Sequence, residues 1–201
     1  EGANVEVIAI HGNFDDAQSA VKRIFTDDET RAQLDRDGMM LSSANSINWG
    51  RLAPQIAYYV SAYCDMVKAG TIRQGDKINV CVPTGNFGNI LAAYIAKQMG
   101  LPVNKFICAS NRNNVLTDFF KKDGEYNRNR DFYTTTSPSM DILISSNLER
   151  LLFFASDFDD RMVAELMAKL NGEGSYKVAS DVFAKIAADF DAGCCDDKHA
   201  A

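Results

Sequence analysis

A short apolar stretch, residues 77–82, runs directly into Pro83-Thr84-Gly85-Asn86-Phe87-Gly88-Asn89 and then into an amphipathic stretch that is closed by Gly100. The first stretch has the length and composition of a buried strand, and residues 89–99 have the apolar spacing of a helix. Residues 105–109 are again of the strand type. Strands that alternate with helices predict an α/β fold, here a three-layer αβα arrangement with a mainly parallel sheet.

The rest of the chain predicts further elements of the same two kinds. Residues 5–10 have the composition of a strand, and residues 15–25 follow with helical spacing. Residues 50–69 predict a long amphipathic helix with Pro54 in its first turn and Gly70 at its end. No repeat or linker divides the chain, so residues 1–201 are expected to form a single unit. Other helices are expected at residues 27–38, 147–155, 159–170 and 179–190.

The loop between the central strand and its helix predicts a phosphate site. Gly85 and Gly88 let the backbone approach a ligand closely and adopt dihedral angles that other residues avoid. Successive N–H groups at the start of a helix bind a phosphate dianion without a cationic side chain. The spacing matches neither a dinucleotide fingerprint nor a nucleoside-triphosphate loop. A monophosphate such as pyridoxal phosphate or FMN remains, although a purely structural turn is an equal alternative from these residues alone.

A similar segment after the first predicted strand serves as an internal comparison. His11-Gly12-Asn13-Phe14-Asp15-Asp16 begins like the loop but has Asp15 where the loop has Gly88. Two carboxylates at this point would repel phosphate, whereas they would stabilise the start of a helix. We therefore expect a helix N-terminus there and no ligand.

Composition narrows the classes of partner. The net charge is −6, so no basic surface is expected for nucleic acid or an anionic membrane. No apolar stretch is long enough to span a membrane. Five cysteines, two of them within strand-like stretches, fit a reducing compartment, and we expect a cytoplasmic protein. The residues Cys194, Cys195 and His199 lack the spacing of a zinc site, so we expect no metal.

Four segments in order resemble threonine synthases, a branch of the fold-type-II pyridoxal-phosphate enzymes related to tryptophan synthase β. They are Gly12-Asn13-Phe14-Asp15-Asp16, the stretch from Ser43 to Trp49, Gly85-Asn86-Phe87-Gly88-Asn89, and the stretch from Ser137 to Leu151. Together they span most of residues 4–155. The resemblance implies a carbon–oxygen lyase that converts O-phospho-L-homoserine and water to L-threonine and phosphate, with pyridoxal phosphate as cofactor.

The resemblance also implies site residues. The cofactor phosphate would be bound by Gly85, Asn86, Phe87, Gly88 and Asn89. The family's Schiff-base lysine, in a Phe-Lys-Asp context, and its Ser-Gly-Asp-Thr-Gly substrate loop do not occur in these 201 residues. We therefore expect no catalytic residue here, and a central fragment, mostly of the large cofactor domain, that is inactive by itself. A homodimer is the assembly that we consider.

A second anion site is predicted where the long helix begins. Asn45, Ser46, Asn48 and Arg51 gather neutral donors, free helix N–H groups and one cation, which suits the substrate phosphate. Helix capping by Ser46 or Asn48, with a solvated Arg51, is the more common role for any one of them. The stretch from Ser137 to Asp141 could line the cleft, but we favour an ordinary turn.

Two functions of other classes stay open on sequence grounds. A non-catalytic α/β domain could hold FMN or another monophosphate, although the residues 112–115 after the third predicted strand offer no aromatic side chain for a flavin ring. The outer faces of the C-terminal helices could serve a structural or oligomerisation role. Spectra of the purified chain would separate a flavin from pyridoxal phosphate.

Overall fold

The computed structural model describes residues 2–12 and 14–200, so Asn13 of the predicted helix-cap segment lies outside the described residues. The chain divides into two compact units, residues 1–42 and residues 43–201, and each is considered by itself.

The first unit contains two helices, α1 (Phe14–Thr26) and α2 (Asp28–Arg36). Both were predicted, and Asp15 and Asp16 lie in the first turn of α1, as expected for a helix start. The strand predicted for residues 5–10 is wrong, because these residues form no strand. A strand is stable only when a neighbouring strand satisfies its backbone. No described residue pairs with this stretch, and its apolar side chains are exposed.

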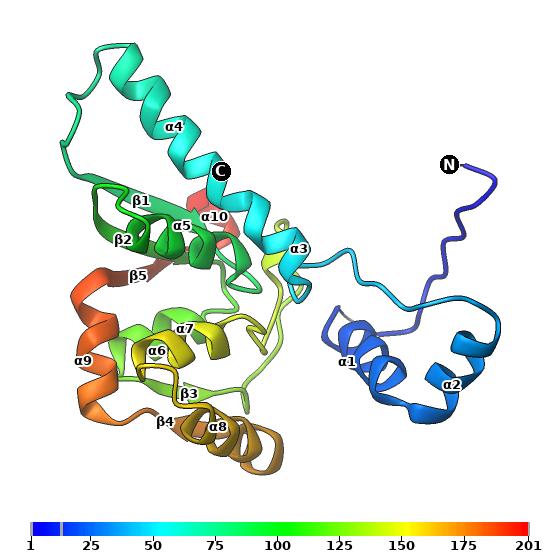
Figure 1. The fold of residues 1–201 in the computed structure, drawn as a ribbon. Coiled ribbons are helices and arrows are strands. Elements are labelled where there is room, and N and C mark those ends of the chain that lie inside the picture. Colours follow the sequence, from blue (N-terminus) through cyan, green and yellow to red (C-terminus); the bar gives the residue numbers. More distant parts are fainter. Residues whose placement is uncertain (1, 13, 201) are drawn as a thin grey trace. The chain divides into compact units, whose positions relative to one another are not determined.

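The second unit is built on a parallel sheet with the strand order β1-β2-β5 (Figure 1). The strands are β1 (Ile78–Pro83), β2 (Val103–Ser110) and β5 (Phe190–Cys194). Helix α5 (Gly88–Gln98) connects β1 to β2, as its apolar spacing predicted. The mixed α/β class with a mainly parallel sheet is thereby confirmed.

The long helix predicted before β1 is present as three consecutive pieces. They are α3 (Trp49–Leu52), a single 3₁₀ turn η1 (Ala53–Gln55) and α4 (Ile56–Lys68). Pro54 lies in the 3₁₀ turn, since proline lacks the N–H that a continuous α-helix would use. Gly70 follows α4 in the left-handed conformation, with φ 71°.

The connection from β2 to β5 contains both predicted and unexpected elements. Three helices match their predicted ranges closely, namely α7 (Leu148–Ala155), α8 (Asp160–Glu173) and α9 (Ser180–Asp189). The sequence did not reveal the short helix α6 (Val115–Lys121) or the antiparallel pair β3 (Glu125–Asn127) and β4 (Ser175–Lys177). The turn favoured for residues 137–141 contains the 3₁₀ turn η2 (Pro138–Met140). Beyond β5, the terminal helix α10 (Asp197–Ala200) was also not predicted.

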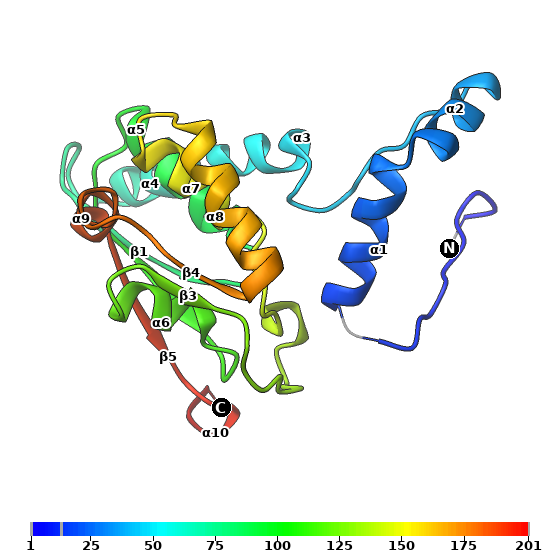
Figure 2. The same cartoon turned by 90° about the horizontal axis from the view of Figure 1, so that it is seen from below.

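One face of the sheet forms the core of this unit. Phe106 of β2 and Phe190 of β5 are buried there with their ring centroids 5.0 Å apart. Helix α5 packs against β1 and β2, and α6 packs against β2 and β5 (Figure 2). The other face of the edge strands is exposed at Cys81 and Asp191. No helix of the described residues is long and apolar enough to cross a membrane.

The thiols give a direct check of this core. Cys108 on β2 is fully buried, and burial raises the pKa of its thiol to about 12. The thiolate is the reactive species, so Cys108 should not react in the folded chain, whereas the exposed Cys64, Cys81, Cys194 and Cys195 should. Titration with a disulfide reagent should therefore find four thiols before and five after denaturation. Five thiols of equal reactivity in the folded chain would contradict this packing.

Candidate functional site

The predicted phosphate loop follows the carboxyl end of β1 and is anchored to the neighbouring strand. The N–H of Thr84 donates to the carbonyl of Ala109 at 2.8 Å. The Thr84 hydroxyl donates to the carbonyl of Val82 at 2.6 Å. Helix α5 begins four residues after Thr84, at Gly88. The loop thus lies at the carboxyl ends of the parallel strands, which is where α/β proteins bind their ligands.

The loop presents a run of unused backbone donors. Among the described residues, no hydrogen bond is formed by the N–H groups of residues 85–90, and no side chain caps the start of α5. Phe87 has φ 63° and ψ 0°, a left-handed residue directly before the helix. Such a change of handedness directs successive N–H groups into one concavity, and the helix dipole adds positive potential. This arrangement is suited to an anion.

Both glycines of the loop are required for close packing, not for unusual dihedral angles. Neither Gly85 nor Gly88 has a positive φ, so the expected conformational role is wrong, and Phe87 adopts the left-handed conformation instead. A Cβ at Gly85 would lie 2.6 Å from the carbonyl oxygen of Ser139. A Cβ at Gly88 would lie 2.6 Å from the Cβ of Ser46. The loop is therefore held between two distant segments of the chain.

The side chain of Phe87 points into the core rather than toward a ligand. Its ring is 1% exposed and lies 5.8 Å from the ring of Phe190 and 6.3 Å from that of Phe120, measured between centroids. Burial of this ring offsets the cost of a left-handed phenylalanine. Phe87 can therefore serve a ligand only through its backbone.

Asn89 likewise uses its side chain within the protein. The Tyr59 hydroxyl of α4 donates to Oδ1 of Asn89 and lies 3.1 Å from its carbonyl oxygen. Burial raises the pKa of Tyr59 to about 12. Asn89 contributes its N–H to the loop, while its side chain ties α5 to α4.

The raised pKa of Tyr59 predicts a pH dependence of stability. Tyr59 would ionise near pH 10 in the unfolded chain and near pH 12 in the folded chain, so the folded state holds this proton more tightly. Its contribution is complete below pH 10 and is lost as the pH rises toward 12. The free energy of unfolding should fall over this interval, and less so in Tyr59→Phe. An equal slope in both chains would contradict the assignment.

Two of the four substrate-side candidates act as local caps. Oδ1 of Asn48 accepts from the N–H of Gly50 at 2.9 Å, and Nδ2 of Asn48 donates to the carbonyl of Ser43 at 2.8 Å. Oδ1 of Asn45 accepts from the N–H of Ile47 at 2.8 Å. These bonds shape the entry into α3 and use the oxygens of both amides.

The other two candidates differ from each other. Ser46 lies against Gly88, so the structure brings the predicted second anion segment beside the phosphate loop. Arg51, in α3, is exposed, and its guanidinium has no hydrogen-bond or ion-pair partner among the described residues. Arg51 is therefore available to an anion.

Asn147, which the sequence did not single out, joins the two segments. It is fully buried and donates through Nδ2 to the Ser46 hydroxyl at 3.0 Å and to the carbonyl of Asn86 at 2.9 Å. Its backbone N–H donates to the same Asn86 carbonyl at 3.0 Å. Arg150 extends this bridge to the carbonyls of Ser46 and Ile47, at 3.1 and 2.6 Å. The only signal for these residues was their place in the family-like stretch from Ser137 to Leu151.

Several buried polar atoms near the loop have no hydrogen-bond partner among the described residues. They include Oδ1 of Asn86 and the hydroxyl of Ser146, the residue next to Asn147. A third is the hydroxyl of Ser110, which ends β2 beside the carboxyl end of β1. Buried polar atoms are normally hydrogen-bonded, so unpartnered ones are a feature of sites that a polar ligand completes.

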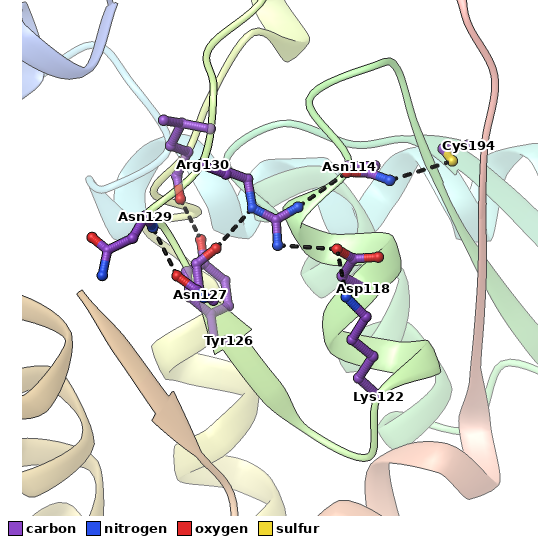
Figure 3. Close-up of polar contacts among 9 residues, drawn as sticks. Asn114, Asp118, Lys122, Tyr126, Asn127, Asn129, Arg130 and Cys194 are labelled. Carbon is purple, nitrogen blue, oxygen red and sulfur yellow. Dashed lines mark hydrogen bonds and ion pairs between the residues drawn. The ribbon is translucent and has the colours of Figure 1, made fainter. Parts of the chain in front are cut away.

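A second polar cluster shapes the chain beyond α6 (Figure 3). The guanidinium of Arg130 lies 3.0 Å from a carboxylate oxygen of Asp118 and 3.0 Å from Oδ1 of Asn114. It also donates to the carbonyl of Asn127 at 2.8 Å. These contacts of Arg130 fix the loop after β3 on α6.

No metal-ligand set is formed by the residues that the structure describes. Within residues 2–12 and 14–200, no three His, Cys, Asp or Glu side chains gather as a metal site would require. The side chain of His199, considered above with Cys194 and Cys195, lies outside the described residues.

The relatives found among known proteins are named threonine synthase or threonine synthase-like. The chain is 49% identical over 190 residues to human threonine synthase-like 1, an alignment that covers 94% of this chain and 25% of the relative. It is 40% identical over 190 residues to the threonine synthase of Corynebacterium glutamicum, covering 93% of this chain and 37% of the relative. No family model matches the chain. The chain therefore spans between a quarter and somewhat more than a third of the length of these relatives.

Solved structures give the same result. The PLP-bound threonine synthase from Brucella melitensis superposes with a TM-score of 0.77 at 41% identity, covering 92% of this chain and 37% of that one. Yeast threonine synthase superposes with a TM-score of 0.74 at 36% identity, covering 93% of this chain and 36% of that one.

Proposed function

We propose that this chain, which belongs to the threonine synthase family, supplies the cofactor-phosphate site of a pyridoxal-phosphate-dependent threonine synthase. The family resemblance inferred from the sequence is confirmed by these relatives. One observation carries the proposal. The N–H groups of residues 85–90 form no hydrogen bonds among the described residues, and this stretch contains the left-handed Phe87 and the N-terminus of α5.

The loop fits the phosphate of pyridoxal phosphate in its donor chemistry. Backbone N–H groups of Gly85, Asn86, Phe87, Gly88 and Asn89 would hold the dianion, and no carboxylate occurs among residues 83–90. The unpartnered atoms beside the loop offer further hydrogen bonds. When bound, pyridoxal phosphate supplies an electron sink for the reaction. The chain itself binds and orients the cofactor through the phosphate.

The segment around Ser46 is the candidate for the substrate phosphate. Arg51 has a guanidinium free of partners among the described residues, and it lies in the helix that Asn48 caps. Ser46 is held beside Gly88 by Asn147, which would place the second anion near the first. The substrate would be O-phospho-L-homoserine, and the products L-threonine and phosphate.

The chain by itself is expected to lack synthase activity. None of its lysines stands in a Phe-Lys-Asp context, and the Ser-Gly-Asp-Thr-Gly sequence is absent from these 201 residues. Borohydride reduction in the presence of pyridoxal phosphate should therefore trap no specific lysine adduct. A trapped adduct together with turnover would overturn this prediction.

Ligand binding to the purified chain tests the proposal. Equilibrium dialysis would compare pyridoxal phosphate with pyridoxal, which is identical except for the phosphate, and with FMN. We expect pyridoxal phosphate to bind at least about tenfold more tightly than pyridoxal, since a phosphate dianion is the ligand that this helix N-terminus favours. Equal binding of the two would refute the phosphate loop. Preference for FMN would support the binding-domain alternative, which the relatives do not favour.

The assembly, the cellular location and the domain origin of the chain need tests of their own. A homodimer, a cytoplasmic location and the assignment of residues 1–201 as a single fragment, mostly of the large cofactor domain, stay predictions. Sedimentation of the chain, cell fractionation and limited proteolysis would test them in turn.

A further inference from the structure

A buried carboxylate lies behind the phosphate loop. Asp141 is 5% exposed and has no cationic partner among the described residues. Four donors surround it instead. They are Nδ2 of Asn111 at 2.7 Å, Nδ2 of Asn113 at 3.0 Å, and the hydroxyl and N–H of Thr135 at 2.7 and 2.9 Å. Hydrogen bonds to a charged group are stronger than those between neutral groups. These four bonds therefore join Asn111, Asn113 and Thr135 rigidly to Asp141.

The donors come from two places in the chain. Asn111 and Asn113 directly follow β2, whereas Thr135 belongs to the long connection after β3. Asn113 bonds this connection a second time, donating to the carbonyl of Tyr133 at 2.7 Å and accepting from its N–H at 2.9 Å. The cluster around Arg130 fixes the start of the same connection (Figure 3). Residues 133–141 are thus closed onto the carboxyl end of β2.

The 3₁₀ turn η2 within this segment packs against the phosphate loop. The turn η2 places the carbonyl oxygen of Ser139 within 2.6 Å, and the Cα of Met140 within 3.4 Å, of a Cβ position on Gly85. The turn that the sequence favoured for residues 137–141 is present, and it contacts the cofactor-phosphate loop directly. Asp141 lies at the end of this turn.

We propose that Asp141 is a positioning residue for the phosphate loop. Through its four bonds it holds the Ser139 carbonyl against Gly85, which sets the direction of the loop N–H groups. The role in binding rests on the proposed function, but the role in positioning does not. Both carboxylate oxygens of Asp141 accept hydrogen bonds from within the protein, so Asp141 acts on the loop through Ser139.

The test compares Asp141→Asn with Asp131→Asn, a matched control whose exposed carboxylate accepts a hydrogen bond from the Tyr133 hydroxyl at 3.4 Å and has no other partner among the described residues. An asparagine presents an N–H₂ group to donors, so Asp141→Asn should weaken pyridoxal phosphate binding about tenfold. The amide resonances of residues 85–89 should shift without any ligand, whereas Asp131→Asn should leave both unchanged. Thr135→Val, which removes one donor and keeps its N–H, provides a milder variant if Asp141→Asn does not fold.

A double-mutant cycle separates positioning from general stability. If Asp141 acts through Ser139 on Gly85, the effects of Asp141→Asn and Gly85→Ala on binding should not add. Unshifted loop amides and unchanged affinity, at a lowered melting temperature, would overturn the inference and leave a merely structural Asp141. If the amides shift but the unsubstituted chain binds no pyridoxal phosphate, positioning stands and the proposed function fails.

Discussion

Gly88→Ala should destabilise the chain by about 2 kcal/mol and abolish most phosphate binding, and Ser46→Gly in the same chain should restore most of both. The added Cβ would lie 2.6 Å from the Cβ of Ser46 and 2.9 Å from its Oγ. Gly88 is the first residue of α5 and does not have a positive φ, so alanine would be unstrained here if the space were open. Removing the side chain of Ser46 opens that space. Denaturant unfolding and pyridoxal phosphate binding would measure the three variants.

The control for this pair is Gly172→Ala. Gly172 lies within α8, and a Cβ there meets nothing within 4 Å. Alanine should stabilise this helix by about 1 kcal/mol and leave binding unchanged. Rescue by Ser46→Gly will be incomplete, because the Asn147 amide then loses its acceptor. A double variant as impaired as Gly88→Ala alone would show that the two segments do not meet as described.

Asn147→Ala should be the most destabilising single change at the site, at about 3 kcal/mol or more. It removes the side-chain donor to the half-buried Asn86 and Ser46, and it leaves the Arg150 guanidinium without Oδ1 of Asn147 as an acceptor. Buried polar groups that lose their partners cost about 1–3 kcal/mol each. Denaturant unfolding would measure the loss.

Asn171→Ala is the matched control for Asn147. Asn171 is exposed in α8, and its backbone carbonyl accepts a bond from Arg128 at 3.2 Å, which alanine would keep. The Asn171 side chain has no hydrogen-bond partner among the described residues. Its replacement should change the free energy of unfolding by less than about 0.5 kcal/mol. Equal effects of the two substitutions would mean that Asn147 does not join the loop to the segment around Ser46.

Local patterns were sufficient for those elements whose own side chains decide their structure. The strand before the loop, the helix after it and the helical stretch around Pro54 follow from apolar spacing. The division of that stretch by a 3₁₀ turn at Pro54 was not predicted. The strand β5 was missed because Asp191 and Gly193 have low strand propensity. It forms because it pairs with β2 and because Phe190 and Ala192 become buried.

The position of the loop between β1 and α5 was predictable, but its construction was not. The loop sequence predicted an anion site, and it suggested that the glycines supply the left-handed conformation. Phe87 does so, because its ring is buried among Phe120 and Phe190, which are distant in sequence. The close contacts of Gly85 with Ser139 and of Gly88 with Ser46 could not be read from spacing. Nor could the bridge from Asn147 to Ser46, which joins residues about a hundred positions apart.

The central claim is that the backbone N–H groups of residues 85–90 bind the cofactor phosphate, and amide NMR spectra of the chain titrated with pyridoxal phosphate test it most directly. We expect the amide resonances of Gly85, Phe87, Gly88 and Asn89 to shift with pyridoxal phosphate and not with pyridoxal. Shifts confined to other residues, or identical shifts with both ligands, would contradict the account.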